Sequence, residues 1–182
     1  MLRSLCLTIA AVAAASASLC HAEPDGARSS LNVTALSAAD GESTLECWQL
    51  DARFQPPPSE TGTEGPQSVF LGDVSNGTYS IIPGGLDTGL HHPPAKQFVL
   101  FFDGVVEISL PTRPEKVVIR GGQNGLMLQV DTADVSHQGH RIKSLGSRRV
   151  SSLRLPLRPG TDVGYQVLYS GPCRESELMG SY

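Results

Sequence analysis

The sequence is poor in aromatic residues, which make up 5% of its 182 residues, and in charged residues, which make up 18%. Its formal net charge of -4 gives no broad basic surface, so no nucleic-acid partner is expected. After residue 22 no apolar run is long enough to cross a membrane, so no membrane partner is expected either. Glycine and proline are plentiful, at 19 and 13 residues, and the 40% of hydrophobic residues excludes a wholly disordered chain. The composition therefore predicts one loop-rich globular domain.

Several enzyme motifs are also missing. The sequence has no Gly-x-Ser-x-Gly turn, no Cys-x-x-Cys pair and no helical His-Glu-x-x-His. The glycine-rich run 121–125 is predicted to be a hairpin loop rather than a nucleotide-binding loop, because no helix is predicted to follow it. These absences argue against the common serine hydrolases, thiol redox enzymes, zinc peptidases and nucleotide-binding enzymes.

Residues 1–22 have the composition of a secretory signal peptide. Arg3 supplies a positive start, an alanine-rich apolar run follows over residues 5–19, and the segment ends in the small residue Ala22. This apolar run is too short to span a bilayer, which needs about 20 residues. We therefore predict a secreted, extracellular protein that is cleaved after Ala22 or, as second choice, after Ala17.

Two cysteines, Cys47 and Cys173, follow this segment, one near each end of the mature chain. In the oxidising environment of exported proteins, such a pair predicts a disulfide that ties the C-terminal tail, residues 171–182. Two buried free thiols are the alternative. The sequons at Asn32 and Asn76 agree with export and predict N-glycosylation at both asparagines.

The pattern of the mature chain predicts an all-β fold. Residues 23–43 lack periodicity and are predicted to be a flexible arm, whereas residues 44–170 form the folded domain. Short apolar runs between glycine and proline turns predict strands at 45–54, 68–74, 79–82, 97–102, 105–110, 117–119, 126–130, 153–157 and 165–169. Eight or more short strands without a convincing helix indicate a two-sheet sandwich or a barrel.

The clearest alternation lies in the predicted strand 153–157. Its leucines share one face, and Ser152, Arg154 and Arg158 share the other. This pattern predicts an apolar face toward the core and a solvated face that carries the arginines. An anion-binding rim above the mouth of the barrel is the alternative for the arginines.

The histidines are the most informative residues. Four follow the signal segment, as two pairs: His91 with His92, and His137 with His140. Histidine is a common ligand of transition metals and a general acid or base near neutral pH. The clustering predicts one site to which both pairs contribute.

The sequence around the first pair resembles a known motif. It reads Gly85-x5-His91-His92-Pro93-x3-Gln97-x6-Gly104. This spacing resembles the first motif of the cupin superfamily, which is Gly, five residues, His-x-His, three or four residues, Glu, six residues and Gly. Two positions differ, because Pro93 stands at the second histidine and Gln97 at the glutamate.

The second pair resembles the second cupin motif less closely. His140, in a Gly-His-Arg sequence, stands where that motif supplies its last histidine. The resemblance covers residues 78–157 and extends to small secreted cupins of fungi. It implies a single cupin-type double-sheet β-barrel, a jelly roll, whose open mouth holds the site.

Strand geometry indicates which histidines face the cavity. His91 and Gln97 are six residues apart, so a regular strand would direct both to one face and His92 to the other. His137 and His140 are three residues apart and cannot both face inward from a regular strand. One histidine of each pair, together with Gln97, should therefore line the cavity.

The resemblance implies roles for these residues. The candidate catalytic or metal-ligating residues are His91, Gln97 and His140, with His92 or His137 as substitutes, and Lys96 and Arg141 would orient an anionic group of the substrate. Metal-binding cupins hold one divalent transition metal with three histidines and a carboxylate, whereas glutamine is a neutral and weak ligand. Metal binding and a metal-free barrel therefore both stay open. Asp131 and Asp134 are predicted to be turn residues rather than catalytic acids.

Two functions remain open at this point. The first is a secreted small cupin-domain protein that binds a small organic molecule in its barrel and transforms it as a metal-assisted oxygenase, isomerase or lyase. The second is a non-catalytic extracellular binding or interaction protein with a metal-free barrel. An apolar face that includes Phe98 and Phe102 would allow two copies to pair as a homodimer.

Overall fold

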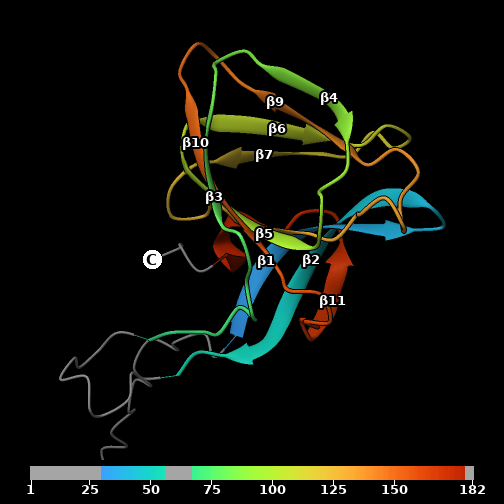
Figure 1. Ribbon diagram of the computed structural model, residues 1–182, viewed down its shortest axis with the longest axis vertical. Helices are drawn as coiled ribbons and strands as arrows, with labels where there is room; N and C mark the ends of the chain where they lie inside the picture. The colour runs from blue at the N-terminus through green and yellow to red at the C-terminus, as the bar shows by residue number, and fades with distance from the viewer. Residues whose placement is uncertain (1–29, 56–66, 179–182) are drawn as a thin grey trace, which may run out of the picture.

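The computed structural model describes residues 30–55 and 67–178 of the chain (Figure 1). The described elements are β1 (Ser30–Ala39), β2 (Glu42–Arg53), β3 (Thr78–Ile82), β4 (Asp87–His91), β5 (Gln97–Asp103), β6 (Val105–Ser109), β7 (Lys116–Arg120), β8 (Leu126–Gln129), β9 (His140–Ser144), β10 (Val150–Pro156), β11 (Tyr165–Ser170) and the short 3-10 helix η2 (Glu175–Glu177). The predicted all-β fold is confirmed. Among the described residues, no helix is long and apolar enough to cross a membrane.

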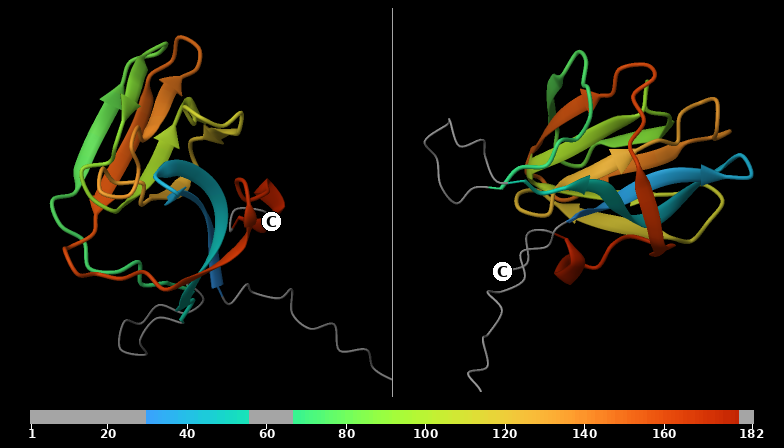
Figure 2. Two further views of the ribbon diagram at one scale, coloured as in Figure 1. Left: turned by 90° about the vertical axis from the view of Figure 1, so that its right-hand side faces the viewer. Right: turned by 90° about the horizontal axis from the view of Figure 1, so that it is seen from below.

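The strands form two sheets. The larger has the order β11-β2-β1-β8-β5-β10-β3, and the smaller has the order β4-β9-β6-β7. All pairs are antiparallel except β1 with β8, which is parallel. Figures 1 and 2 show the smaller sheet packed over one face of the larger sheet. The protein is therefore built from two packed sheets, as the strand pattern predicts.

Two apolar clusters hold the sheets in place. The first lies between them and contains residues of both, among them Val99, Phe101, Val106, Ile108 and Ile142. The second lies on the other face of the larger sheet and includes Val33, Trp48, Leu50, Phe98 and Leu128. The larger sheet is thus buried on both faces over its central strands.

The predicted flexible arm is wrong for the part that the structure describes. Residues 30–39 form β1, which lies between β2 and β8 in the larger sheet. Leu31, Val33 and Ala35 enter the second cluster, whereas Leu36 enters the first. A strand that is buried on both faces need not alternate between polar and apolar residues, so the sequence pattern did not predict a strand at residues 30–39. Residues 23–29 lie outside the described residues.

Two other segments differ from the predicted strands. The predicted strand at 68–74 makes only single bridges, from Ser68 to Gln55 and from Val74 to Leu157. The structure adds two strands of the smaller sheet, β4 and β9, that the apolar pattern does not mark. Both contain the histidines of the predicted site, and their polar residues concealed their strand character.

The leucine face of β10 packs in an apolar cluster, as the alternation predicts, but the face that carries Ser152 and Arg154 is not the solvated face of the prediction. Ser152 is buried, and Arg154 pairs with Val99, which belongs to the cluster between the sheets. Leu155 and Leu157 instead join the cluster on the other face of the larger sheet. Both faces of β10 are covered, so alternation alone could not say which of them faces the smaller sheet.

The predicted disulfide between Cys47 and Cys173 is present, with 4.5 Å between the two Cα atoms. It joins β2 to the segment before η2, and both cysteines are buried. The backbone amide of Cys173 also donates a hydrogen bond of 3.1 Å to the hydroxyl of Thr34 on β1. The tail beyond β11 is therefore fixed to the centre of the larger sheet.

The two sequons lie in different surroundings. Asn32 is buried, and its side-chain nitrogen donates to the carbonyl of Glu177 at 3.1 Å. Asn76 is exposed in a turn, where its φ angle is 47°. In the folded protein only Asn76 of these two presents its amide to solvent, and its glycosylation stays a prediction.

Replacing Cys47 and Cys173 by alanine together should lower the free energy of unfolding by roughly 4–5 kcal/mol, because the disulfide closes a loop with a sequence separation of 126 residues. Urea unfolding followed by tryptophan fluorescence measures the effect. The wild-type protein in dithiothreitol is the matched control and should unfold like the double variant. Equal unfolding midpoints for the oxidised wild type and the variant would contradict this expectation.

Candidate functional site

A group of polar side chains lies between the two sheets at the end where the β4–β5, β8–β9 and β10–β11 loops meet. Strand register places these residues: His91 on β4 pairs with His140 on β9, and Gln97 on β5 pairs with Gln129 on β8. Paired residues on neighbouring strands project from the same face of a sheet. The three candidates predicted from sequence, His91, Gln97 and His140, are thus brought together.

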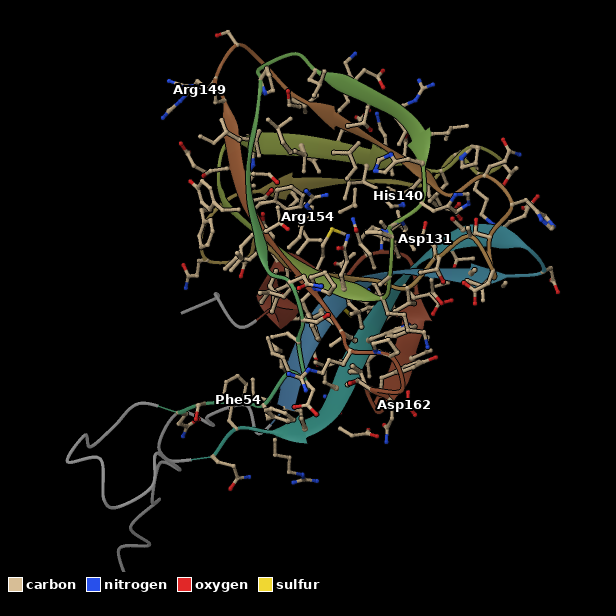
Figure 3. All side chains as sticks on the ribbon, in the orientation of Figure 1. Phe54, Asp131, His140, Arg149, Arg154 and Asp162 are labelled. Carbon is tan, nitrogen blue, oxygen red and sulfur yellow. A yellow bond between two sulfur atoms is a disulfide. The ribbon has the colours of Figure 1, made fainter. Side chains whose placement is uncertain are left out.

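The centre of this group is a buried pair, Asp131 and His140, both labelled in Figure 3. Both side chains are 0% exposed, and the Nδ1 atom of His140 lies 2.7 Å from Oδ2 of Asp131. The same carboxylate oxygen accepts a hydrogen bond of 2.8 Å from the hydroxyl of Ser43. Asp131 therefore orients the imidazole, with the proton on Nδ1 and Nε2 directed to the remaining polar residues.

The loop before β9 positions His140. The hydroxyl of Ser136 lies 2.9 Å from the hydroxyl of Ser43 and accepts a hydrogen bond of 3.0 Å from the amide of Gly139. Gly139 has a φ angle of 66°, and a Cβ at this position would collide with the carbonyl of His91. Glycine is therefore required where β9 comes close to β4.

Two glutamines extend the network beyond His140. The side-chain nitrogen of Gln97 donates to Oε1 of Gln129 at 2.7 Å, and Nε2 of Gln129 lies 3.5 Å from Nε2 of His140. Two further oxygens, Oε1 of Gln97 and Oδ1 of Asp131, are buried and have no hydrogen-bond partner among the described residues. A buried acceptor without a partner costs about 1–3 kcal/mol, so each of these two oxygens has unused capacity for a hydrogen bond from a water molecule or a ligand.

His91 is the member of the group that reaches solvent. It is half-buried, and its ring centroid lies 4.7 Å from that of His140, with 56° between the ring planes. Its Nδ1 atom lies 3.1 Å from the carbonyl oxygen of Gly89. Burial holds the pKa of His91 below its ordinary value of 6.5, and His140 adds to this shift, although the Gly89 carbonyl opposes it. His91 is therefore a neutral imidazole near pH 7 and is able to accept a proton.

The substitutes for these histidines lie elsewhere. The Nε2 atom of His92, which directly follows β4, lies 2.9 Å from the carbonyl oxygen of Ser136. His137 is exposed, and its backbone amide donates to the carbonyl of Gly41 at 2.8 Å. Neither residue belongs to the central group.

An open hollow of about 1130 Å³ lies outside His91 and is lined by residues 91–96, 132–134 and 157–162. Lys96, a predicted substrate-orienting residue, lines this hollow. Arg141, the other, does not: it is exposed and lies 3.6 Å from Asp87. Arg141 directly follows His140 on β9, so strand alternation turns it to the outer face of the sheet.

The sequence missed Asp131 and Gln129. Asp131 was predicted to be a turn residue, yet it is fully buried against His140, and Gln129 links His140 to Gln97. The only signal for Asp131 was an acidic residue a short distance before a motif histidine. Acidic residues in loops are common, so this signal was too weak to select it.

The side chains near His91 and His140 can be tested as ligands for the predicted transition metal. Within residues 30–55 and 67–178, no group of three His, Cys, Asp or Glu side chains is placed to hold a metal ion. His91 and His140 supply two imidazoles, Gln97 supplies a neutral oxygen, and Asp131 is already bonded to His140. Transition-metal sites of this kind ordinarily combine more imidazoles with a carboxylate that offsets the ionic charge. The residues present therefore do not fit a transition-metal centre well.

Comparison of the chain with protein-family models gave no match, and comparison with curated proteins gave none. The resemblance to cupins stays a prediction from the motif residues.

Replacing Asp131 by asparagine should lower the free energy of unfolding by about 3 kcal/mol, because it breaks a fully buried charged hydrogen-bond pair. Asp134→Asn is the matched control. It makes the same chemical change in the same loop at an exposed residue, and should change stability by less than about 0.5 kcal/mol. Urea unfolding of both variants tests this, and equal effects would contradict a structural role for Asp131.

The imidazole of His91 should titrate below pH 6.5, measured from its C2–H signal in NMR spectra recorded across pH. Because the unfolded chain binds this proton more readily, stability should fall as pH is lowered from about 6.5 toward the folded pKa. The loss of stability between pH 7.5 and 5.5 should be smaller in His91→Gln than in the wild type. A midpoint at or above 6.5 would show that burial does not control this group.

Proposed function

We propose that this chain is a secreted cupin-type protein that binds a small polar organic molecule at the open end of its interior and moves protons on it through His91. The observation that carries this proposal is the half-buried His91 imidazole, held neutral beside the buried Asp131–His140 pair. Perturbed histidines next to buried polar networks are typical of functional sites.

Membership of the cupin superfamily is supported by the convergence of the motif residues. His91 and Gln97 come from the segment that resembles the first motif, and His140 from the segment that resembles the second. These three residues belong to strands of both sheets and form one polar group. The disulfide and the signal-like residues 1–22 support export.

The chemistry available to the group is proton transfer. With Nδ1 of His91 hydrogen-bonded to the Gly89 carbonyl, its Nε2 atom has a free electron pair that accepts a proton from the bound molecule. Returning that proton to another atom of the molecule gives an isomerisation, and passing it to a leaving group gives an elimination. Both balance without an oxidant, whereas an oxygenase reaction consumes dioxygen, so we favour isomerase or lyase chemistry.

The His140 pair supports the site rather than reacting. His140 is 0% exposed, so a bound molecule reaches it only through the neighbouring side chains. We assign it, with Asp131, to holding the glutamines and His91 in place. The oxygen of Gln97 that has no partner among the described residues would accept a hydrogen bond from the molecule.

A non-catalytic binding protein is the second candidate, and one observation favours it. The Nε2 atom of His140 is already 3.5 Å from Gln129, and the network from Ser43 to Gln97 is largely self-contained. Such a network can serve to fix one core arrangement without any reaction. The two candidates differ in whether a bound molecule exchanges protons with the protein.

His91→Ala should weaken binding of a small polar molecule at least about tenfold, because the variant removes the exposed imidazole of the site. The probes are succinate, pyruvate, benzoate and their three amides, and NMR shifts of the imidazole signals report binding. His137→Ala, an exposed histidine outside the group, should bind like the wild type. Treatment with EDTA should leave binding unchanged.

Catalysis and mere binding are separated with pyruvate in D2O. The proposal expects deuterium to enter the methyl group in the presence of the wild type and not of His91→Ala. Binding without deuterium exchange would favour the second candidate, and no shift with any of the six probes would reject the site.

A further inference from the structure

Arg154 is more buried than every other described lysine and arginine. All other lysines and arginines that the structure describes are exposed, whereas Arg154 is half-buried. On β10 it pairs with Val99 of β5 and Thr78 of β3, and Val99 is 3% exposed in the cluster between the sheets. Arg154 therefore projects into the space between the sheets, where Figure 3 shows its side chain. The alternating pattern predicted the opposite, a solvated face.

The guanidinium of Arg154 has no carboxylate partner among the described residues. Within residues 30–55 and 67–178, its side chain makes one hydrogen bond, of 3.2 Å, from Nη2 to the hydroxyl of Ser80 on β3. Its Nε atom is buried and has no hydrogen-bond partner within the described part of the chain. By contrast, the exposed Arg141 and Arg148 lie 3.6 and 3.7 Å from carboxylates.

This arrangement is costly for the folded protein alone. A partly buried charge without an opposite charge nearby is less well solvated than one at the surface, and a buried N–H donor without an acceptor adds to the cost. Residues that stay in such positions are commonly retained for binding. An anion on the guanidinium would supply both the missing charge and an acceptor for Nε.

The position of Arg154 connects it to the candidate site. Pro156 pairs with Gln97, and Arg154 is two residues farther along β10 on the same face. Two residues of a strand span about 7 Å, so Arg154 and Gln97 lie within the length of one small organic molecule. The space between the sheets thus offers a cation at one point and a free amide oxygen and an imidazole at another.

We propose that Arg154 binds the carboxylate of a small organic acid whose other end reaches Gln97 and His91. A guanidinium binds a carboxylate through two parallel N–H···O bonds, and the Ser80 hydroxyl is close enough to donate a third. A single arginine matches one carboxylate better than a phosphate dianion, which would leave a charge unpaired. This inference rests on the proposed function and names the class of molecule that the site takes.

The test compares each acid with its own amide. Binding of succinate, pyruvate and benzoate, and of their amides, is measured by isothermal calorimetry on the disulfide-bonded protein. The proposal expects at least one acid to bind at least tenfold more tightly than its amide. Arg154→Gln should remove this preference, so that the acid binds no more tightly than its amide.

Arg149→Gln is the matched control, because it makes the same change of charge at an exposed arginine, also labelled in Figure 3. It should keep the preference for the acid. A loss of preference in this control as well would reduce the effect to net charge and overturn the proposal.

The ligand-free stability of Arg154→Met gives a second readout. A residue kept for binding should be dispensable for folding, so the urea midpoint of this variant should equal or exceed that of the wild type. A lower midpoint would assign Arg154 a structural role and overturn the proposal.

The possible failures are distinguishable. If acids and amides bind equally and both shift the His91 signals, the role of Arg154 is wrong and the proposed function stands. If none of the six probes shifts the His91 signals, the proposed function fails and the inference fails with it.

Discussion

The hydrogen bond between Asp131 and His140 is the interaction on which the site depends. It joins the loop that leaves β8 of the larger sheet to the first residue of β9 in the smaller sheet. Through Ser43 it also reaches the start of β2. Because the pair is fully buried, the three segments cannot move apart without exposing a carboxylate that has lost its partners. These hydrogen bonds fix His140, and His140 in turn lies beside His91.

The space between the sheets is divided between apolar and polar residues. Apolar residues from β1, β2 and each strand from β5 to β10 fill one part with closely packed side chains. Histidines, glutamines, Ser80 and Arg154, which come from β3, β4, β5, β8, β9 and β10, form the other part. The first part stabilises the sandwich, since burial of apolar surface is the main favourable contribution to folding. The second contains groups whose hydrogen-bonding capacity is only partly used.

The sequence predicted the fold class, most strands and the disulfide, because turn residues and local apolar runs are local properties. It also predicted that His91, Gln97 and His140 come together, since motif spacing carries that information across strands. It missed β1 because a strand buried on both faces lacks alternation. It placed Arg154 opposite the leucines correctly but predicted that this face is solvated, because alternation does not show that a second sheet covers it. Asp131 escaped notice because only the folded chain shows that a loop carboxylate is buried against His140.

The parallel pairing of β1 with β8 has a consequence for biosynthesis. Thr34 near the start of the folded domain lies opposite Met127, so β1 finds one of its two neighbours only after most of the chain has been made. The other strand of the hairpin, β2, pairs with β11 and forms its disulfide with Cys173, and both of these partners are synthesised later still. Contacts between residues so distant in sequence form slowly. The larger sheet is therefore completed only after synthesis of the whole domain, and until then the β1–β2 hairpin lacks its long-range partners β8 and β11.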